Sequence, residues 1–194
     1  MDCYLLVGGR SRRMGVPKAL LPFGDSTFID RIASEARRVF ARVVAVERAV
    51  SAKAVWPEAD ATIFEGPHDD EAAIFGVASA LEDANWKCFV LAVDYPLITA
   101  DVLRELAERF EASAASMLLP VWRGIPQPLC AGYAASMLEL VGRRIVEGKY
   151  DLQSLAVGAE LVEMNGIELM NVNNPEELEE AKSAYERQKL LPSR

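Results

Sequence analysis

Short apolar runs alternate with longer segments of helical periodicity over the first 120 residues, and this alternation limits the folds open to the chain. The runs are short and largely apolar, which is typical of strands covered on both faces of a parallel sheet. Strands that alternate with helices predict repeated βαβ units. The five predicted strands are Cys3 to Val7, Val43 to Val46, Thr62 to Phe64, Cys88 to Val93 and Ser116 to Leu119.

Three amphipathic stripes between these runs predict helices that pack on the sheet. From this pattern we expect an α/β fold of three layers, a Rossmann-like, mostly parallel sheet with helices on both faces. The stripes are Ile29, Ile32, Ala33, Ala36 and Phe40; Ile74, Val77, Ala78 and Leu81; and Leu103, Leu106, Ala107 and Phe110.

The pattern weakens after Pro120, where we expect a strand, a helix, a pair of short segments and a last helix. That last helix is the clearest, because Asn174 can cap it and Pro175 suits its first position. No repeat or linker interrupts the chain, so we expect a single domain over residues 1–194. The four elements are the strand Pro128 to Tyr133, the helix through Leu138, Val141 and Ile145, the pair Glu160 to Met164 and Ile167 to Met170, and the helix ending near Gln188 before a frayed tail, Leu190 to Arg194.

The charge and the apolar content exclude several classes of partner. The chain has 29 acidic and 21 basic side chains and a net charge of −8. Such a surface repels phosphate backbones, so we expect no nucleic-acid partner. No apolar run approaches the length of a membrane helix, so we expect no membrane association. Cys3, Cys88 and Cys130 lie far apart among apolar residues, which predicts buried reduced thiols and a cytoplasmic protein.

The loop from Gly8 to Lys18 combines three glycines with four cations directly after the first predicted strand. Glycines let backbone N–H groups approach an anion closely, and Arg13 and Lys18 could neutralise a triphosphate. The loop is not a Walker A motif, because Lys18 follows a proline, nor a dinucleotide motif, because Gly8 and Gly9 are adjacent. Its place at the carboxyl edge of a sheet favours a phosphate cradle over a solvated basic turn.

Asp94 follows the apolar run that ends at Val93 and is the second chemical signal. A carboxylate at the end of a buried strand is costly unless a partner neutralises it. Mg²⁺ is a natural partner, because it is held by one or two carboxylates together with substrate phosphates. His68, the only histidine, lies in an acidic stretch that we expect to be a solvated loop.

The order of these segments resembles the sugar-nucleotide pyrophosphorylase-like nucleotidyltransferases, and within them the molybdenum cofactor guanylyltransferases. The first loop, from Leu6 to Gly15 with Lys18, resembles the signature loop of that family. Four further segments agree in order: Val93 to Pro96, Gly124 to Leu129, Asn171 to Leu178 and, more weakly, Ile74 to Gly76. The resemblance implies a nucleotide-diphospho-sugar transferase-like fold.

The resemblance also implies which residues bind the nucleotide. Leu6, Val7 and Gly8 would contact the guanine base and the ribose through backbone groups. Lys18 would hold the phosphates, and Arg13 would share their charge.

It further implies roles for two carboxylates and one amide. Glu65 would read the purine, because a carboxylate can accept from guanine N1–H and the 2-amino group together. Asp94 would hold Mg²⁺, and Arg13, Lys18 and Asp94 would form the catalytic set. Asn173 would lie near the metal or the phosphate of the pterin acceptor.

The implied reaction joins GMP from GTP to the phosphate of molybdenum-molybdopterin and releases pyrophosphate. The implied protein partners are those that deliver molybdopterin and those that mature molybdoenzymes. Three departures keep alternatives open, namely Val7, Val46 and the pair Ala72-Ala73, where the family usually has alanine, asparagine and glycine-proline. The alternatives are a CTP-dependent or other nucleotidyltransferase of the same fold, and a non-catalytic nucleotide-binding domain.

Overall fold

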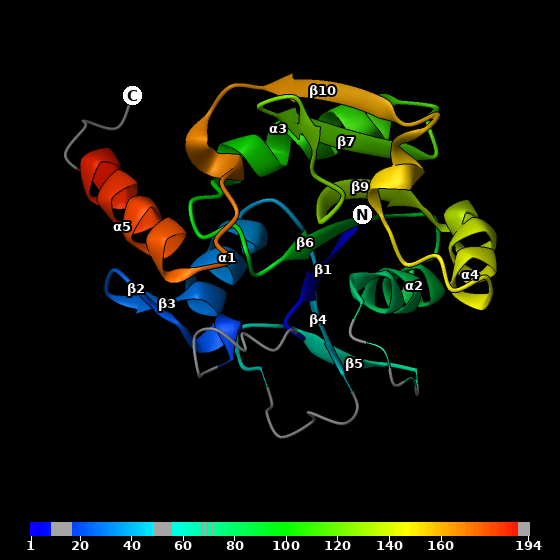
Figure 1. Ribbon diagram of the computed structural model, residues 1–194, viewed down its shortest axis with the longest axis horizontal. Coiled ribbons are helices and arrows are strands. Elements are labelled where there is room, and N and C mark those ends of the chain that lie inside the picture. The colour runs from blue at the N-terminus through cyan, green and yellow to red at the C-terminus, as the bar shows by residue number, and fades with distance from the viewer. Residues whose placement is uncertain (9–16, 49–55, 67, 69, 71, 190–194) are drawn as a thin grey trace.

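The computed structural model describes residues 1–8, 17–48, 56–66, 68, 70 and 72–189, and its centre is one mixed sheet (Figure 1). The strand order is β10-β7-β9-β6-β1-β4-β5, with β8 paired to β7. Its strands are β1 (Asp2–Leu6), β4 (Val43–Arg48), β5 (Ala61–Glu65), β6 (Lys87–Ala92), β7 (Met117–Trp122), β8 (Ile125–Pro126), β9 (Cys130–Ala134) and β10 (Glu160–Met164).

All five strands predicted before Pro120 are present, and β1, β4, β5 and β6 run parallel to one another. The predicted strand after Pro128 is β9, which is antiparallel to both β6 and β7. The two short segments predicted at Glu160 to Met164 and Ile167 to Met170 form different elements. β10 pairs in parallel with β7, and Ile167–Leu169 forms the short 3-10 helix η5. The predicted tail, Leu190 to Arg194, lies outside the described residues.

Helices follow the predicted stripes. Thr27 starts α1 with a capping box, because its hydroxyl accepts from the Asp30 N–H while the Asp30 carboxylate accepts from the Thr27 N–H. Asn174 caps α5 as predicted, accepting from the Glu177 N–H at 2.9 Å. The helices are α1 (Phe28–Arg37), α2 (Ala73–Asp83), α3 (Ala100–Ala112), α4 (Leu138–Val146) and α5 (Pro175–Lys189), with 3-10 helices η1 (Lys18–Leu20), η3 (Ala135–Met137) and η4 (Gln153–Ala156).

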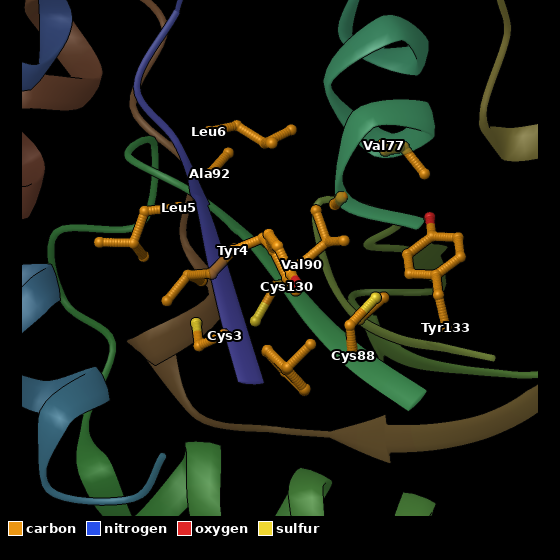
Figure 2. Packing of buried hydrophobic residues seen from close by; sticks show 14 of the residues in the cluster. Cys3, Tyr4, Leu5, Leu6, Val77, Cys88, Val90, Ala92, Cys130 and Tyr133 are labelled. Atoms are coloured by element: carbon orange, nitrogen blue, oxygen red, sulfur yellow. The ribbon is translucent and has the colours of Figure 1, made fainter. Parts of the chain in front are cut away.

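The alternation of side chains along β1 separates the two faces of the sheet. Tyr4 points to α2, where its hydroxyl donates to Asp83 at 2.8 Å. α4 packs beside α2 on this side. In Figure 2, Cys3 and Leu5 lie on one side of β1, whereas Val77 of α2 and Tyr133 of β9 lie on the other. Apolar residues are therefore needed on both faces, which explains why the strands are continuous apolar runs.

The opposite face is covered by α1 and α3. Phe89 of β6 packs against Phe40, just beyond α1, with ring centroids 5.3 Å apart. Phe89 is paired with Gly132 of β9, over which Phe110 of α3 lies. The predicted three layers, a mostly parallel sheet with helices on both faces, are thereby confirmed. Among the residues that the structure describes, no helix is both long and apolar enough to cross a membrane.

The three cysteines are buried and free, as predicted (Figure 2). Burial raises the pKa of the Cys88 thiol to about 12, which keeps it protonated at neutral pH. These thiols are packing groups of the sheet.

The contact between α3 and β9 yields a test of packing. A Cβ added at Gly132 would lie 2.3 Å from Cδ1 of Phe110, whereas one added at Gly142 of α4 would meet nothing within 4 Å. We expect Gly132→Ala to lower the free energy of unfolding by about 1–3 kcal/mol through overpacking. Gly142→Ala, the matched control, should raise it by about 0.5–1 kcal/mol, because alanine loses less backbone entropy in a helix. Urea denaturation measures both; equal effects would contradict the described packing.

Candidate active site at the carboxyl edge of the sheet

Four parallel strands, β5, β4, β1 and β6, end at one edge of the sheet, and the predicted site residues follow them there. The sheet bonds continue past the strand ends, because the Val7 N–H donates to the Val46 carbonyl at 3.1 Å. The Val93 N–H donates to the Leu6 carbonyl at 3.4 Å. The backbone at this edge is therefore held in place by hydrogen bonds of the sheet. This is the edge at which ligands bind in open α/β sheets.

Lys18, Asp94 and Asn173 meet at this edge. The Lys18 Nζ lies 3.1 Å from Oδ1 of Asp94 and donates to Oδ1 of Asn173, also at 3.1 Å. The Asn173 N–H in turn donates to the Glu177 carboxylate at 2.5 Å, and the neighbouring Val172 N–H donates to the Asp94 carbonyl at 2.8 Å. The structure thus brings together three predicted site residues from three distant parts of the chain.

A second apolar cluster, separate from the sheet core, holds these segments in place. It joins the chain just after Lys18 to the segments around Asn173 and α5. Figure 1 shows α5 beside the hairpin formed by β2 (Pro22–Phe23) and β3 (Ser26–Thr27). The buried members of this second apolar cluster are Leu21, Phe23, Phe28, Leu97, Met170, Val172, Leu178, Ala181 and Ala184.

The Asp94 carboxylate is in an environment that penalises its charge. Burial raises the pKa of this carboxyl, and the Lys18 ammonium opposes that rise without cancelling it. The Lys18 and Asp94 side chains are only 14% and 25% exposed. Lys18 therefore compensates the negative charge of Asp94 only in part, and a further bound cation would stabilise the ionised carboxylate.

A metal at Asp94 would need ligands from the substrate. No group of three or more His, Cys, Asp or Glu side chains able to hold a metal occurs within the described part of the chain. Asp94 supplies one hard oxygen donor, which fits a cation that takes its other ligands from phosphates and water.

Glu65 and His68 form a second polar group at the same edge. The expectation that His68 lies in a solvated loop is wrong, because its side chain is only 9% exposed. Its ring stacks on Phe75 of α2 at a centroid distance of 3.7 Å, and Nε2 lies 2.9 Å from Oε2 of Glu65. Tyr150 closes the group, since its ring packs on Phe75 and its hydroxyl donates to the Asp70 carboxylate at 2.8 Å.

Glu65 is buried at the end of β5 and faces two glycines. Burial raises the pKa of its carboxyl, while His68 and Arg48 act in the opposite direction. Its Oε1 lies 3.8 Å from a Cβ built on Gly8 and 3.0 Å from one built on Gly76. Glycine at position 76 is what permits this close approach of the carboxylate.

The structure does not unite all predicted residues in one cluster. Glu65 and Gly8 lie close to each other, whereas Lys18 forms its ion pair with Asp94. Leu6 and Val7 are buried, at 6% and 5% exposure, so any nucleotide contact would come from their backbone, as expected. Arg13 lies outside the described residues.

Sequence reasoning missed the packing of His68, Phe75 and Tyr150 and the role of Glu177. The spacing of Glu65 and His68, three residues apart, was an available signal. The stack of His68 on Phe75 had no local signal, because it depends on the path between β5 and α2.

A lysine and a half-buried aspartate at the carboxyl edge of a parallel sheet, after a basic glycine loop, are typical of an α/β protein of the nucleotidyltransferase class. Comparison with known proteins identifies the family within this class. The chain belongs to the MobA-like NTP transferase domain family, whose model matches residues 3–157. Nucleotidyltransferases of this kind generally use a divalent metal.

Relatives and solved structures agree with this assignment. A probable molybdenum cofactor guanylyltransferase from Bacillus cytotoxicus is 26% identical over 187 residues, 91% of this chain and 93% of the relative. One from Aquifex aeolicus is 28% identical over 185 residues, 91% of this chain and 87% of the relative. The crystal structure of molybdopterin-guanine dinucleotide biosynthesis protein A from Archaeoglobus fulgidus superposes with a TM-score of 0.78 at 25% identity, covering 96% of this chain and 100% of that one.

The burial of Asp94 predicts a cost in stability. A carboxyl whose pKa is raised on folding stabilises the protein when protonated, and this stabilisation is lost as pH rises through the folded pKa. We expect Asp94→Asn to melt at or above the wild-type temperature at about pH 7, with a difference that shrinks toward about pH 4. Calorimetric melting across this range measures it.

Asp25→Asn is the matched control, because the Asp25 side chain is 97% exposed. Its melting temperature should follow the wild type at every pH. A lower melting temperature for Asp94→Asn at neutral pH would show that the ion pair with Lys18 outweighs the cost of burial.

Proposed function

We propose that this chain transfers GMP from GTP to the phosphate of molybdenum-molybdopterin, with release of pyrophosphate, in the synthesis of molybdopterin guanine dinucleotide. The names of the relatives support this reaction. The main structural support for this reaction is that Lys18 contacts both Asp94 and Asn173 at the carboxyl edge of the sheet. A domain that only bound a nucleotide would have less need of both a lysine and a half-buried carboxylate there.

The reaction requires alignment and charge neutralisation more than a protein base. A phosphate monoester has a second pKa of about 6, so the acceptor is already ionised near neutral pH. Its oxygen attacks the α-phosphorus of GTP, and the bond to the β-phosphate oxygen breaks with pyrophosphate as the leaving group. The protein's task is to bring two anions together and to stabilise the charge on the leaving group.

Lys18 supplies positive charge to the phosphates in this proposal, and Arg13 shares that role. The Lys18 ammonium lies between a carboxylate and an amide oxygen, so it is held at the edge before the nucleotide arrives. Asn173, whose N–H donates to Glu177, accepts from the ammonium and helps to keep it in place. In this proposal Asn173 would also contact the acceptor phosphate.

Asp94 would hold Mg²⁺ together with the phosphate oxygens of the nucleotide. The bound cation would neutralise charge on the triphosphate. The chain's own contribution is a half-buried carboxylate whose charge is poorly compensated by Lys18 alone. Glu65 and the backbone of Leu6, Val7 and Gly8 would contact the guanine base and the ribose.

We also propose that residues 1–194 form a single domain and act in the cytoplasm. α5 lies beyond the matched region, and Tyr185 of this helix packs on Phe23 with ring centroids 5.0 Å apart. The second apolar cluster therefore ties the last helix to the start of the chain. Three buried thiols without disulfides suit a reducing compartment.

Pyrophosphate release tests the proposed reaction. Purified protein with GTP, Mg²⁺ and molybdenum-molybdopterin should release pyrophosphate, and CTP in place of GTP should not support turnover. Lys18→Ala and Asp94→Ala should each lower turnover by roughly 10²–10³-fold, because each removes charge stabilisation of the transition state.

Lys182→Ala is a matched control, since Lys182 lies on α5 in an exposed pair with Glu179. It should turn over at the wild-type rate. Pyrophosphate release with CTP but not with GTP would assign the chain to cytidylyl transfer. Near-normal turnover in Lys18→Ala or Asp94→Ala would refute the role proposed for that residue.

A further inference from the structure

The backbone around Asp94 is held by hydrogen bonds from two other parts of the chain. The Asp94 carbonyl accepts from the Val172 N–H at 2.8 Å, just before α5. Two residues further on, the carbonyl of the buried Pro96 accepts from Nε of Arg31 on α1 at 2.5 Å. A proline has no N–H, so its carbonyl is the backbone group through which it can be held. The charged guanidinium makes this bond stronger than one between neutral groups.

Tyr185 of α5 supports the guanidinium that reaches Pro96. Cζ of Arg31 lies 4.4 Å from the centroid of the Tyr185 ring, which is within the range of a cation–π interaction. The same ring covers the turn of the β2–β3 hairpin, because a Cβ built on Gly24 would lie 2.6 Å from Cε1 of Tyr185. Gly24 has a φ of +61°, so glycine suits both the turn and this close contact. Tyr185 therefore contacts both Arg31 and the hairpin that follows Lys18.

α5 is thereby connected to both charged residues of the candidate site. Its first turn contains Glu177, which accepts from the Asn173 N–H, and the Asn173 side chain accepts from Lys18. Nearer its other end, Tyr185 supports the guanidinium that holds the Asp94 segment. α5 lies beyond the part of the chain that the family model matches. A helix outside the matched region thus contacts the groups that hold both site residues.

We propose that Arg31 and Tyr185 are positioning residues that hold the Asp94 carboxylate where it binds Mg²⁺ together with the nucleotide. This inference rests on the proposed function. Arg31 acts through the Pro96 carbonyl, and Tyr185 acts by supporting Arg31. Loss of a group that orients a metal ligand typically lowers metal affinity about 10–100-fold. Arg31 holds the backbone near Asp94, so we expect an effect at the lower end of this range.

The test is calorimetric titration of the full chain with GTP, with and without Mg²⁺. Arg31→Met removes the donor to Pro96, while the methionine side chain can still cover the Tyr185 ring. It should weaken GTP binding about tenfold in the presence of Mg²⁺. Without Mg²⁺ the dissociation constant should stay within about twofold of the wild type, because the change acts through the metal ligand.

Substitutions of Tyr185 test the second half of the inference. Tyr185→Leu removes the aromatic face from Arg31 and should weaken GTP binding with Mg²⁺ about threefold. Tyr185→Phe keeps that face and should bind as the wild type does. In an Asp94→Asn background, Arg31→Met should have no further effect, because it acts through that carboxylate.

Arg37→Met is the matched control. Arg37 lies on the same helix as Arg31, and its Nε also donates to a backbone carbonyl, that of Glu58, at 2.8 Å. Glu58 precedes β5 and therefore lies toward the amino edge of the sheet, away from Asp94. Arg37→Met should bind GTP as the wild type does, with and without Mg²⁺.

Two results would overturn this inference and leave the proposed function intact. One is binding by Arg31→Met within about twofold of the wild type in the presence of Mg²⁺. The other is an equal loss with and without Mg²⁺, which would show that Arg31 supports packing alone. A wild-type chain that binds no GTP, or whose GTP binding Mg²⁺ does not strengthen, would refute the proposed function together with this inference.

Discussion

The partly buried charge of Asp94 is the constraint on which the candidate site depends. β6 carries this carboxylate to the end of a buried strand, where burial raises its pKa. In the folded chain the Lys18 ammonium forms an ion pair with this carboxylate and also donates a hydrogen bond to Asn173. A site that keeps such a charge for function is expected to sacrifice some stability.

Two parts of the fold hold the residues of the candidate site in place. The sheet, covered by α1 and α3 on one face and by α2 and α4 on the other, fixes the strand ends from which Gly8, Glu65 and Asp94 project. The second apolar cluster fixes Lys18 and Asn173 against that edge. The proposed phosphate-binding and base-binding residues thus lie at the ends of different strands, with Lys18 and Asp94 near β6 and Glu65 at the end of β5.

Local patterns were sufficient to predict the longer strands and the helices and to single out Lys18 and Asp94 as candidate site residues, because each has a signal within a few residues of sequence. The contact of Lys18 with Asn173 spans 155 residues and was not predicted, since the family resemblance implied only that Asn173 lies near the metal or the acceptor phosphate. The pairing of β10 with β7 and the stack of His68 on Phe75 were not predicted. Both depend on how distant segments pass each other, which periodicity does not encode. The roles assigned to the site residues, Arg13 included, stay predictions.

Calorimetric titration of the purified chain with GTP and with CTP, each in the presence and absence of Mg²⁺, would show whether Asp94 binds a cation together with a guanine nucleotide. We expect binding of GTP that strengthens with Mg²⁺ in the wild type and loses that gain in Asp94→Asn, with little binding of CTP. Equal binding of both nucleotides, or a Mg²⁺ effect that survives in Asp94→Asn, would contradict this expectation.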